Sequence, residues 1–277
     1  AGLQRLNYAP GTTPERQCEG ICESDVRGPS GIGRTRSRQD VLQGLYKFRF
    51  TTQRGAGCGV MFIAPGGRLY GGDTGYSFIG TFTEADGVIA AEFRMSRHYY
   101  GPQYVPMFDV NDIVMNFTGT SQGEETHFPG GSAALPGVRF TVILTAIHDI
   151  DAPPPGTVGP DGIGNGLYSI HIRMLDGVDG GNSGVMVLHD GRIRGGDAFF
   201  DYIGAYSSAN GKWKGELVHR EHTPAKGERP LFGGHEVGIG FSGTYGDDGA
   251  EAEATALAGK RSIRFKAEMR KLVGVEN

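Results

Sequence analysis

The sequence predicts an all-β protein built from two tandem antiparallel β-barrels. Three observations support this prediction: a high glycine content, an internal repeat, and apolar residues that follow a period of two. Glycine accounts for 48 of the 277 residues, against an average share of roughly 7% in proteins. Because 38% of the residues are hydrophobic and 10% are aromatic, the chain has enough apolar material for folded cores. This composition fits short strands joined by glycine turns and argues against a helical bundle.

The internal repeat is the most informative feature of the sequence. Motifs of the first half return in the second half at an offset of 122–125 residues. The matched segments are 44–46 with 166–168, 58–61 with 183–186, 67–73 with 191–197 and 117–120 with 241–244, and His98 matches His222. Since so many matches share one nearly constant offset, we interpret the chain as two copies of one fold.

The repeat divides the chain into four parts. Residues 1–43 form a polar extension rich in Gly and Arg, which lacks the apolar side chains needed to form a core by itself. The first barrel is expected over residues 44–148 and the second over residues 166–273. Residues 149–165, which include three consecutive prolines, are expected to form a linker.

Within each copy, apolar and polar residues alternate, and this pattern predicts antiparallel strands. Residues 45–50 and 168–173 are examples, and each such run lasts roughly five to eight residues before a Gly, Asn or Asp. Because closure removes exposed sheet edges, roughly seven or eight such strands per copy are expected to form a barrel. Aromatic side chains that point inward would fill it, and the candidates are Tyr46, Phe48, Phe62 and Phe82.

Two hairpins and one ambiguous segment complete the strand assignment. Asp86-Gly87 in the first copy and Asn210-Gly211 in the second predict tight hairpin turns, since both residues of each pair tolerate positive φ. Residues 250–258 are rich in Ala and Glu, which favour helix. Their alternation and their place in the repeat predict a strand instead.

Charge and cysteine content narrow the classes of function. The chain carries 27 Lys and Arg residues against 31 Asp and Glu residues, a net charge of −4, so we expect no direct binding of nucleic acid. Its apolar runs are far shorter than the roughly 18 residues that a membrane helix needs. The odd number of cysteines, Cys18, Cys22 and Cys58, argues against a disulfide framework and favours a cytoplasmic location.

The sequence predicts no catalytic site, no metal site and no cofactor. Ser183 in a Gly-Asn-Ser-Gly segment and His148 superficially resemble parts of a serine protease, but only 35 residues separate them. The first copy has Cys58 where the second has Ser183, so we expect Ser183 to be structural. His219 and His222 form a close pair, yet on a strand they would point to opposite faces and could not share one metal ion.

The strongest motif common to both copies is Gly-Gly-Asp. It comprises Gly71, Gly72 and Asp73 in the first copy and Gly195, Gly196 and Asp197 in the second. Glycines permit a positive φ or a bulge, and an aspartate can accept hydrogen bonds from freed backbone amides. Because the motif recurs, we expect it to be structural. The alternative is a carboxylate that binds calcium or a ligand, although one aspartate provides few of the oxygens that calcium needs.

The order of these motifs resembles the GrlR-type negative regulators of bacterial type III secretion. The residues that carry the resemblance are 44–46, 59–62, 71–73 and 78–80, with their equivalents in the second copy. This family has a lipocalin-like, eight-stranded barrel that forms a dimer. The resemblance therefore implies two tandem lipocalin-like barrels, and the repeat predicts that they pack as an internal pseudo-dimer.

The resemblance also implies a function. The known member of the family sequesters a transcriptional activator, and an acidic loop after the shared motif contributes to this. Glu84 and Asp86 match two acidic positions of that loop, so they are the predicted partner-binding residues. We expect a non-enzymatic, cytoplasmic regulator that binds a partner protein such as a transcriptional activator. The alternative is a carrier that holds a small apolar ligand inside a barrel.

Overall fold

The structure is a computed structural model that describes most of the repeat region. The described residues are 42–101, 104, 106–122, 125–148, 152–175, 182–224 and 230–275. Residues 1–41 of the predicted extension, residues 149–151 of the predicted linker, and Cys18 and Cys22 lie outside them.

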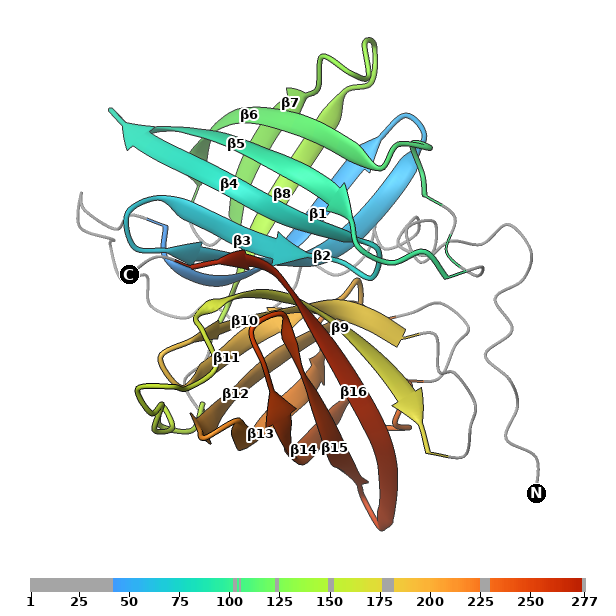
Figure 1. Cartoon of the computed structure of the whole chain (residues 1–277). Helices are drawn as coiled ribbons and strands as arrows, with labels where there is room; N and C mark the ends of the chain where they lie inside the picture. The colour runs from blue at the N-terminus through green and yellow to red at the C-terminus, as the bar shows by residue number, and fades with distance from the viewer. Residues whose placement is uncertain are drawn as a thin grey trace, which may run out of the picture.

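The described residues form two closed antiparallel barrels of eight strands each, which Figure 1 shows stacked one on the other. The first barrel contains β1 (Gly44–Thr52), β2 (Gly55–Ala64), β3 (Arg68–Gly72), β4 (Tyr76–Ala85), β5 (Val88–Arg97), β6 (Asp112–Gln122), β7 (Glu125–Gly131) and β8 (Phe140–Ile147). The second contains β9 (Gly166–Met174), β10 (Asn182–His189), β11 (Arg192–Gly196), β12 (Phe200–Ala209), β13 (Lys212–Glu221), β14 (Glu236–Tyr245), β15 (Gly249–Ala258) and β16 (Arg261–Gly274). Each strand pairs with the next, and β8 closes on β1 as β16 closes on β9. The predicted all-β fold with two tandem barrels is confirmed.

The two predicted hairpin turns are also confirmed. Asp86 and Gly87 have φ values of 52° and 77°, and Asn210 and Gly211 have φ values of 53° and 71°. These left-handed conformations match the twist of the flanking strands, which explains why Asp-Gly and Asn-Gly occur there. The ambiguous segment is strand β15, in which alanines face the barrel interior and glutamates face solvent.

Aromatic side chains fill the interior of the first barrel. The ring centroid of Phe48 lies 5.1 Å from that of Phe78 and 6.1 Å from that of Phe93. Phe93 in turn stacks on Phe117 at 5.4 Å. The remaining cavity measures about 20 Å³, which is enough for about one water molecule. The first barrel is thus almost solid.

Three of the four aromatic residues predicted to point inward do so, namely Tyr46, Phe48 and Phe82. The prediction for Phe62 was wrong. Phe62 packs outside the barrel, against residues of the second barrel, and the guanidinium carbon of Arg194 lies 5.1 Å from the centre of its ring. The inward-facing neighbours on β2 are Met61 and Ile63 because successive side chains of a strand point to opposite faces.

The two barrels pack against each other through an apolar cluster, here called the junction. Its buried members are Leu45, Val60, Phe62, Ala64, Tyr70, Leu167, Val185, Val187, Ile203 and Val275. Strand β3 contacts β10, and β2 contacts β11, so the contacts are reciprocal. Figure 1 shows these strands at the facing sides of the two barrels. This arrangement is that of a two-fold dimer built within one chain.

The second glycine of each Gly-Gly-Asp motif lies at the junction. A Cβ atom at Gly72 would lie 2.7 Å from Cγ1 of Val185, and one at Gly196 would lie 2.7 Å from Cγ1 of Val60. Both distances are shorter than real Cβ atoms tolerate. A Cβ atom would lie even closer to a backbone carbonyl oxygen of the same barrel, 2.4 Å from that of Tyr76 at Gly72 and 2.3 Å from that of Phe200 at Gly196. Glycine is therefore required both by the following turn of its own barrel and by the close approach of the two barrels, and neither residue has a positive φ.

We expect Gly72→Ala to lower the free energy of unfolding by about 1–3 kcal/mol, because the added methyl group would clash with the carbonyl oxygen of Tyr76 in the same barrel and with Val185 across the junction. Gly240→Ala is the matched control, since Gly240 is exposed on β14 and an added Cβ would meet no atom within 4 Å. Urea denaturation of both variants measures the difference. Equal stabilities would show that the junction tolerates a side chain at Gly72.

We expect the chain to be a monomer of about 29.5 kDa, because each barrel already buries the outer faces of two strands against the other. Size-exclusion chromatography with light scattering measures the mass. A dimeric or larger species would contradict the expected monomer, and barrels that tumble independently in NMR relaxation would contradict the internal pseudo-dimer.

Candidate functional site

The predicted partner-binding residues lie at the tip of the β4–β5 hairpin. Glu84 is near the end of β4, Asp86 is the first residue of the turn, and both side chains are exposed. Neither carboxylate has a hydrogen bond or an ion pair with another described residue. The tip therefore presents two negative charges to solvent, and its role in binding a partner stays a prediction.

The equivalent hairpin of the second barrel packs against the segment 152–165 at Ser208, which is buried, while Ala209 and Asn210 at its tip are exposed. The hydroxyl of Ser208 accepts a hydrogen bond from the backbone N–H of Ile163 at 3.1 Å. The Asn210 N–H donates to the carboxylate of Asp161 at 2.9 Å. Val158 pairs with Ser208 in an isolated parallel bridge. Since Ser208 and Asn210 stand where the first barrel has Glu84 and Asp86, only the first barrel presents its hairpin as an open acidic surface.

The aspartate of each Gly-Gly-Asp motif closes a turn. The Oδ1 atom of Asp73 accepts hydrogen bonds from the N–H groups of Gly75 and Tyr76, both at 2.7 Å. Asp197 accepts from Phe199 at 2.7 Å and from Phe200 at 2.9 Å. Both aspartates are buried, and in each the Oδ1 atom is committed to the backbone of the turn.

The first glycine of the motif serves the sheet of its own barrel. A Cβ atom at Gly71 would lie 2.2 Å from the carbonyl oxygen of Val60, and one at Gly195 would lie 2.2 Å from that of Val185. Each of these carbonyls belongs to the neighbouring strand. All three residues of the motif therefore have structural roles, and these roles are the same in both copies.

A histidine lies beside each of these turns. The Nε2 atom of His98 is 3.2 Å from the carbonyl oxygen of Asp73, and Nε2 of His222 is 3.2 Å from that of Asp197. Burial lowers the pKa of His98 to about 4 and that of His222 to about 3. Both rings are therefore neutral at pH 7, and Nε2–H can donate to the carbonyl. The two histidines occupy matching positions of the repeat, and this match indicated in the sequence that both make the same contact.

The two barrels differ in the polar groups that they bury. Tyr202 and His219 of the second barrel stand where the first barrel has Phe78 and Met95. The hydroxyl of Tyr202 donates a short hydrogen bond to Oδ2 of Asp197. Burial raises the pKa of Asp197 to about 6 and raises that of Tyr202 well above its ordinary value. This acid–phenol pair is internally satisfied.

The sequence did not predict that His219 is a buried residue of the barrel interior. Its side chain is 2% exposed, and neither ring nitrogen has a hydrogen-bond partner. The ring stacks on Phe200 at 4.1 Å and on Tyr202 at 5.2 Å. Burial lowers its pKa to about 3, so the ring is neutral, with one N–H donor and one acceptor. Two unsatisfied nitrogens in an apolar interior are costly.

His219 lines a cavity inside the second barrel that measures about 40 Å³, twice the size of the cavity in the first barrel. The cavity is larger because several lining residues are small. Ala252 stands where the first barrel has Phe128, and Leu217 stands where it has Phe93. The second barrel thus has slightly more interior space than the first, and the surface of its cavity is apolar.

The other candidates from the sequence do not assemble into a reaction centre. The hydroxyl of Ser183 is buried and donates to the carbonyl oxygen of Ile170 at 3.1 Å, whereas His148 is exposed. Within the described residues, no three His, Cys, Asp or Glu side chains are grouped so that they could hold a metal ion. Cys58 is buried.

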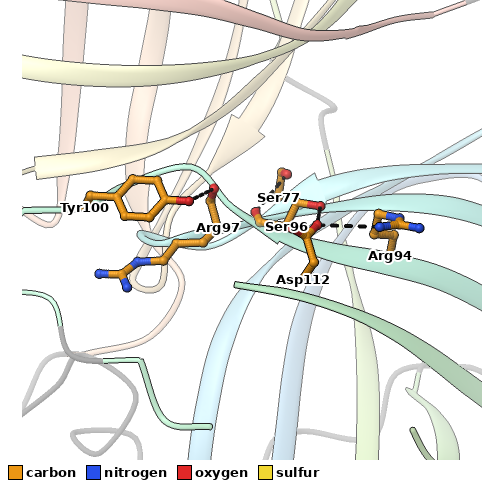
Figure 2. A network of polar contacts seen from close by, with 6 residues as sticks. All are labelled: Ser77, Arg94, Ser96, Arg97, Tyr100 and Asp112. Atoms are coloured by element: carbon orange, nitrogen blue, oxygen red, sulfur yellow. Dashed lines mark hydrogen bonds and ion pairs between the residues drawn. The ribbon is translucent and has the colours of Figure 1, made fainter. Parts of the chain in front are cut away.

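Figure 2 shows a polar network on the first barrel. The equivalent residues of the second barrel make different polar contacts. The Ser96 hydroxyl donates to Asp112 at 2.6 Å, and Arg94 lies 3.7 Å from the same carboxylate. Asp201 and Arg220 of the second barrel form a direct ion pair at 3.2 Å instead. The two copies therefore keep the same backbone, but the polar contact of Asp112 is exposed, whereas the carboxylate of Asp201 is buried.

An Arg–Tyr pair lies beside this network. The guanidinium carbon of Arg97 lies 4.6 Å from the ring centre of Tyr100, whose side chain is 63% exposed (Figure 2). Arg97 also donates to the carbonyl oxygen of Tyr99 at 2.9 Å. Exposed Tyr and Arg side chains are common in protein interfaces, so this pair is a second exposed feature of the first barrel.

Comparison with known proteins does not extend these observations. No protein-family model matches the chain, and a search of curated proteins finds no matching sequence. Over the part of the chain that the structure describes, there is no helix long and apolar enough to cross a membrane.

We expect the free energy of unfolding to fall as the pH is lowered from about 6.5 to 4. His98, His219 and His222 have lowered pKa values in the folded chain, so the unfolded chain binds more protons in this range. Each histidine contributes up to about 1.4 kcal/mol per pH unit. Asp197 acts in the opposite sense below pH 6, because its raised pKa favours the protonated folded form. Burial also raises the pKa of Asp201, which acts in the same sense as Asp197. The net effect between pH 6 and 4 is therefore a loss of stability smaller than the three histidines alone would give.

Urea denaturation at several pH values measures this slope. In His219→Met, which copies the first barrel, the difference in bound protons should fall by about one. An unchanged slope in this variant would show that His219 is already protonated in the folded chain or is not buried.

Proposed function

We propose that this protein acts without catalysis, by binding a partner protein through the acidic hairpin of the first barrel. The observation that carries the proposal is the contrast between the two hairpin tips. Glu84 and Asp86 are exposed without cationic partners among the described residues, whereas Ser208 in the second barrel is buried under the segment 152–165. We place this activity in the cytoplasm, in agreement with the expectation from cysteine content.

A basic surface is the kind of partner that fits this tip. Two carboxylates on a tight turn create a local negative potential, which accelerates encounter with a positive surface and selects against negative ones. The resemblance to GrlR-type negative regulators supports a transcriptional activator as the partner, since the DNA-binding face of such a protein is basic. In this proposal the protein would be a negative regulator that competes with DNA for that face.

The alternative function, a carrier of an apolar ligand, has little support in the first barrel. Its interior is filled by stacked phenylalanines and retains a cavity of only about 20 Å³. Because a packed core does not open without loss of stability, the first barrel is suited to binding through its outer surface.

Removal of the two carboxylates should weaken partner binding by about 3-fold to 10-fold at low salt, and by less at moderate salt. The partner is first identified by pull-down from the native cell and mass spectrometry. The test variant is Glu84→Gln with Asp86→Asn, because asparagine tolerates the positive φ at this position. Titration calorimetry at two salt concentrations compares its affinity with that of the wild type.

The matched control is Asp247→Asn with Asp248→Asn, which removes the same charge from an exposed turn of the second barrel. This control should bind as the wild type does. Equal affinities and equal salt dependence for both double variants would refute the hairpin as the binding surface, and Tyr100→Ala would then test the second exposed feature of the first barrel.

A further inference from the structure

We propose that residues 34–38 of this chain, Arg-Thr-Arg-Ser-Arg, bind along the edge of strand β4 beside the acidic hairpin. The site is the stretch 83–85 of β4, beyond Thr81, where the pairing of β4 with β3 ends. Residues 34–38 are outside the part of the chain that the structure describes. Their binding is inferred from the second copy of the fold, from the point at which the chain enters the first barrel, and from charge.

The second barrel shows what this edge binds. Strand β11 pairs with β12 only as far as Ala205, and the chain that leads into the second barrel takes its place beyond that point. The Ser208 N–H donates to the carbonyl oxygen of Thr157 at 3.0 Å, and the Gly159 N–H donates to the carbonyl oxygen of Ser208 at 2.8 Å. Val158 thereby forms a parallel bridge with Ser208.

The first barrel has the same edge, and there it is exposed. The pair of Ala85 with Val88 closes the hairpin turn, and the next pair is Glu84 with Ile89. Because hydrogen-bonded and non-hydrogen-bonded pairs alternate, the N–H and C=O of Glu84 point away from β5 and toward the open edge. Among the described residues, no strand or bridge reaches Glu84 on that side. Glu84 is exposed, whereas its counterpart Ser208 is 4% exposed.

The chain enters both barrels in the same way. In each barrel the hydroxyl of a tyrosine on the first strand donates to a carbonyl of the chain before it, at 3.3 Å from Tyr46 and at 2.7 Å from Tyr168. Leu42 and Ile163 precede these carbonyls by one residue, and both are buried in the core of their barrel. Leu42 lies in the core beside Phe82 of β4. The residues before Leu42 therefore begin at the end of the barrel that carries the acidic hairpin.

The spacing along the chain brings residues 34–38 to this edge. Val158 forms its bridge five residues before Ile163, and the residue five positions before Leu42 is Ser37. Five residues reach the edge in the second copy, so the same number suffices in the first. The two neighbours of Ser37 are arginines, and their backbone groups would make the hydrogen bonds that the neighbours of Val158 make.

The charges on the two sides of the contact differ together between the copies. In the second copy, residues 155–159 and the hairpin residues 207–210 are all uncharged. In the first copy, residues 34–38 contain three arginines, and the hairpin residues 83–86 include Glu84 and Asp86. Neither carboxylate has an ion pair with another described residue. A basic segment therefore faces an acidic edge, which favours this pairing over others.

This binding concerns one chain alone, but it has a consequence that rests on the proposed function. A basic partner at the hairpin would compete with residues 34–38, which carry charge of the same sign. The extension would then lower the apparent affinity of the hairpin for any basic surface by the fraction of chains in which the edge is occupied.

Hydrogen exchange of the Glu84 amide, measured by NMR on the full-length protein without a partner, tests the binding. In the wild type we expect this amide to be protected, as the Ser208 amide is by its bond to the preceding segment. The test variant is Arg34→Gln with Arg36→Gln and Arg38→Gln. Its Glu84 amide should exchange about 10-fold faster, because the loss of charge contacts favours opening of the edge.

The matched control is Arg5→Gln with Arg16→Gln and Arg27→Gln, which removes three positive charges from the same extension. Its Glu84 amide should exchange as in the wild type. The Ser208 amide is the internal reference in every sample, and its unchanged protection shows that the barrels are folded.

Trypsin tests the segment itself, since it cleaves after arginine. In Glu84→Gln with Asp86→Asn, cleavage after residues 34, 36 and 38 should be about 3-fold to 10-fold faster than in the wild type. Cleavage after residue 27 should be unchanged. The control with Asp247→Asn and Asp248→Asn should be cleaved as the wild type is.

Three results would overturn the proposal. Equal exchange of the Glu84 amide in the wild type and in the variant of residues 34–38 would leave the edge free for a partner protein. An equal effect of the control arginines would show that only the net charge of the extension matters. Protection of Glu84 that rises with protein concentration would assign the edge to a second copy of the chain. None of these results decides whether a partner binds the hairpin, which the calorimetric titration measures separately.

Discussion

The close approach of the two barrels at the junction is the constraint on which the rest of the structure depends. Gly72 admits Val185, and Gly196 admits Val60, at distances that leave no room for a Cβ atom. Because the contact is reciprocal, the outer face of β2 must be apolar as well as the inner face. The same motif supplies the aspartate that closes the following turn, so the turn and the junction depend on three consecutive residues in each copy.

Fusion of two barrels in one chain permits a division of roles that a symmetric dimer cannot have. In a homodimer each surface occurs twice and each change is made in both subunits. Here the junction and the aspartate turns stay alike, while the parts away from the junction differ. The first barrel has a nearly solid interior and an open acidic hairpin. The second has a hairpin that packs at Ser208 against the segment 152–165, and a buried histidine without a hydrogen-bond partner.

The asymmetry between the barrels lowers the stability of the second barrel, because one of its buried polar groups lacks a hydrogen-bond partner. Asp197 and Tyr202 satisfy each other, but His219 lies in an apolar interior without a partner. Such a group destabilises the folded state unless something binds it. The first barrel shows that the fold accepts methionine at the equivalent position, Met95, so a histidine is not required by the architecture.

Much of the fold could be predicted from the sequence, because its determinants are local. The repeat, the alternation along each strand and the Asp-Gly and Asn-Gly turns predicted two barrels, and even the alanine-rich β15 was assigned correctly. The side of β2 on which Phe62 packs could not be predicted, since a strand buried on both faces has no polar side to mark its orientation. The sequence placed His219 on a strand, and the repeat offset makes Ser208 the counterpart of Glu84. Only the tertiary structure decided that the imidazole lacks a partner and that the segment 152–165 packs against the second hairpin at Ser208, because exposure and hydrogen bonding depend on residues distant in the chain.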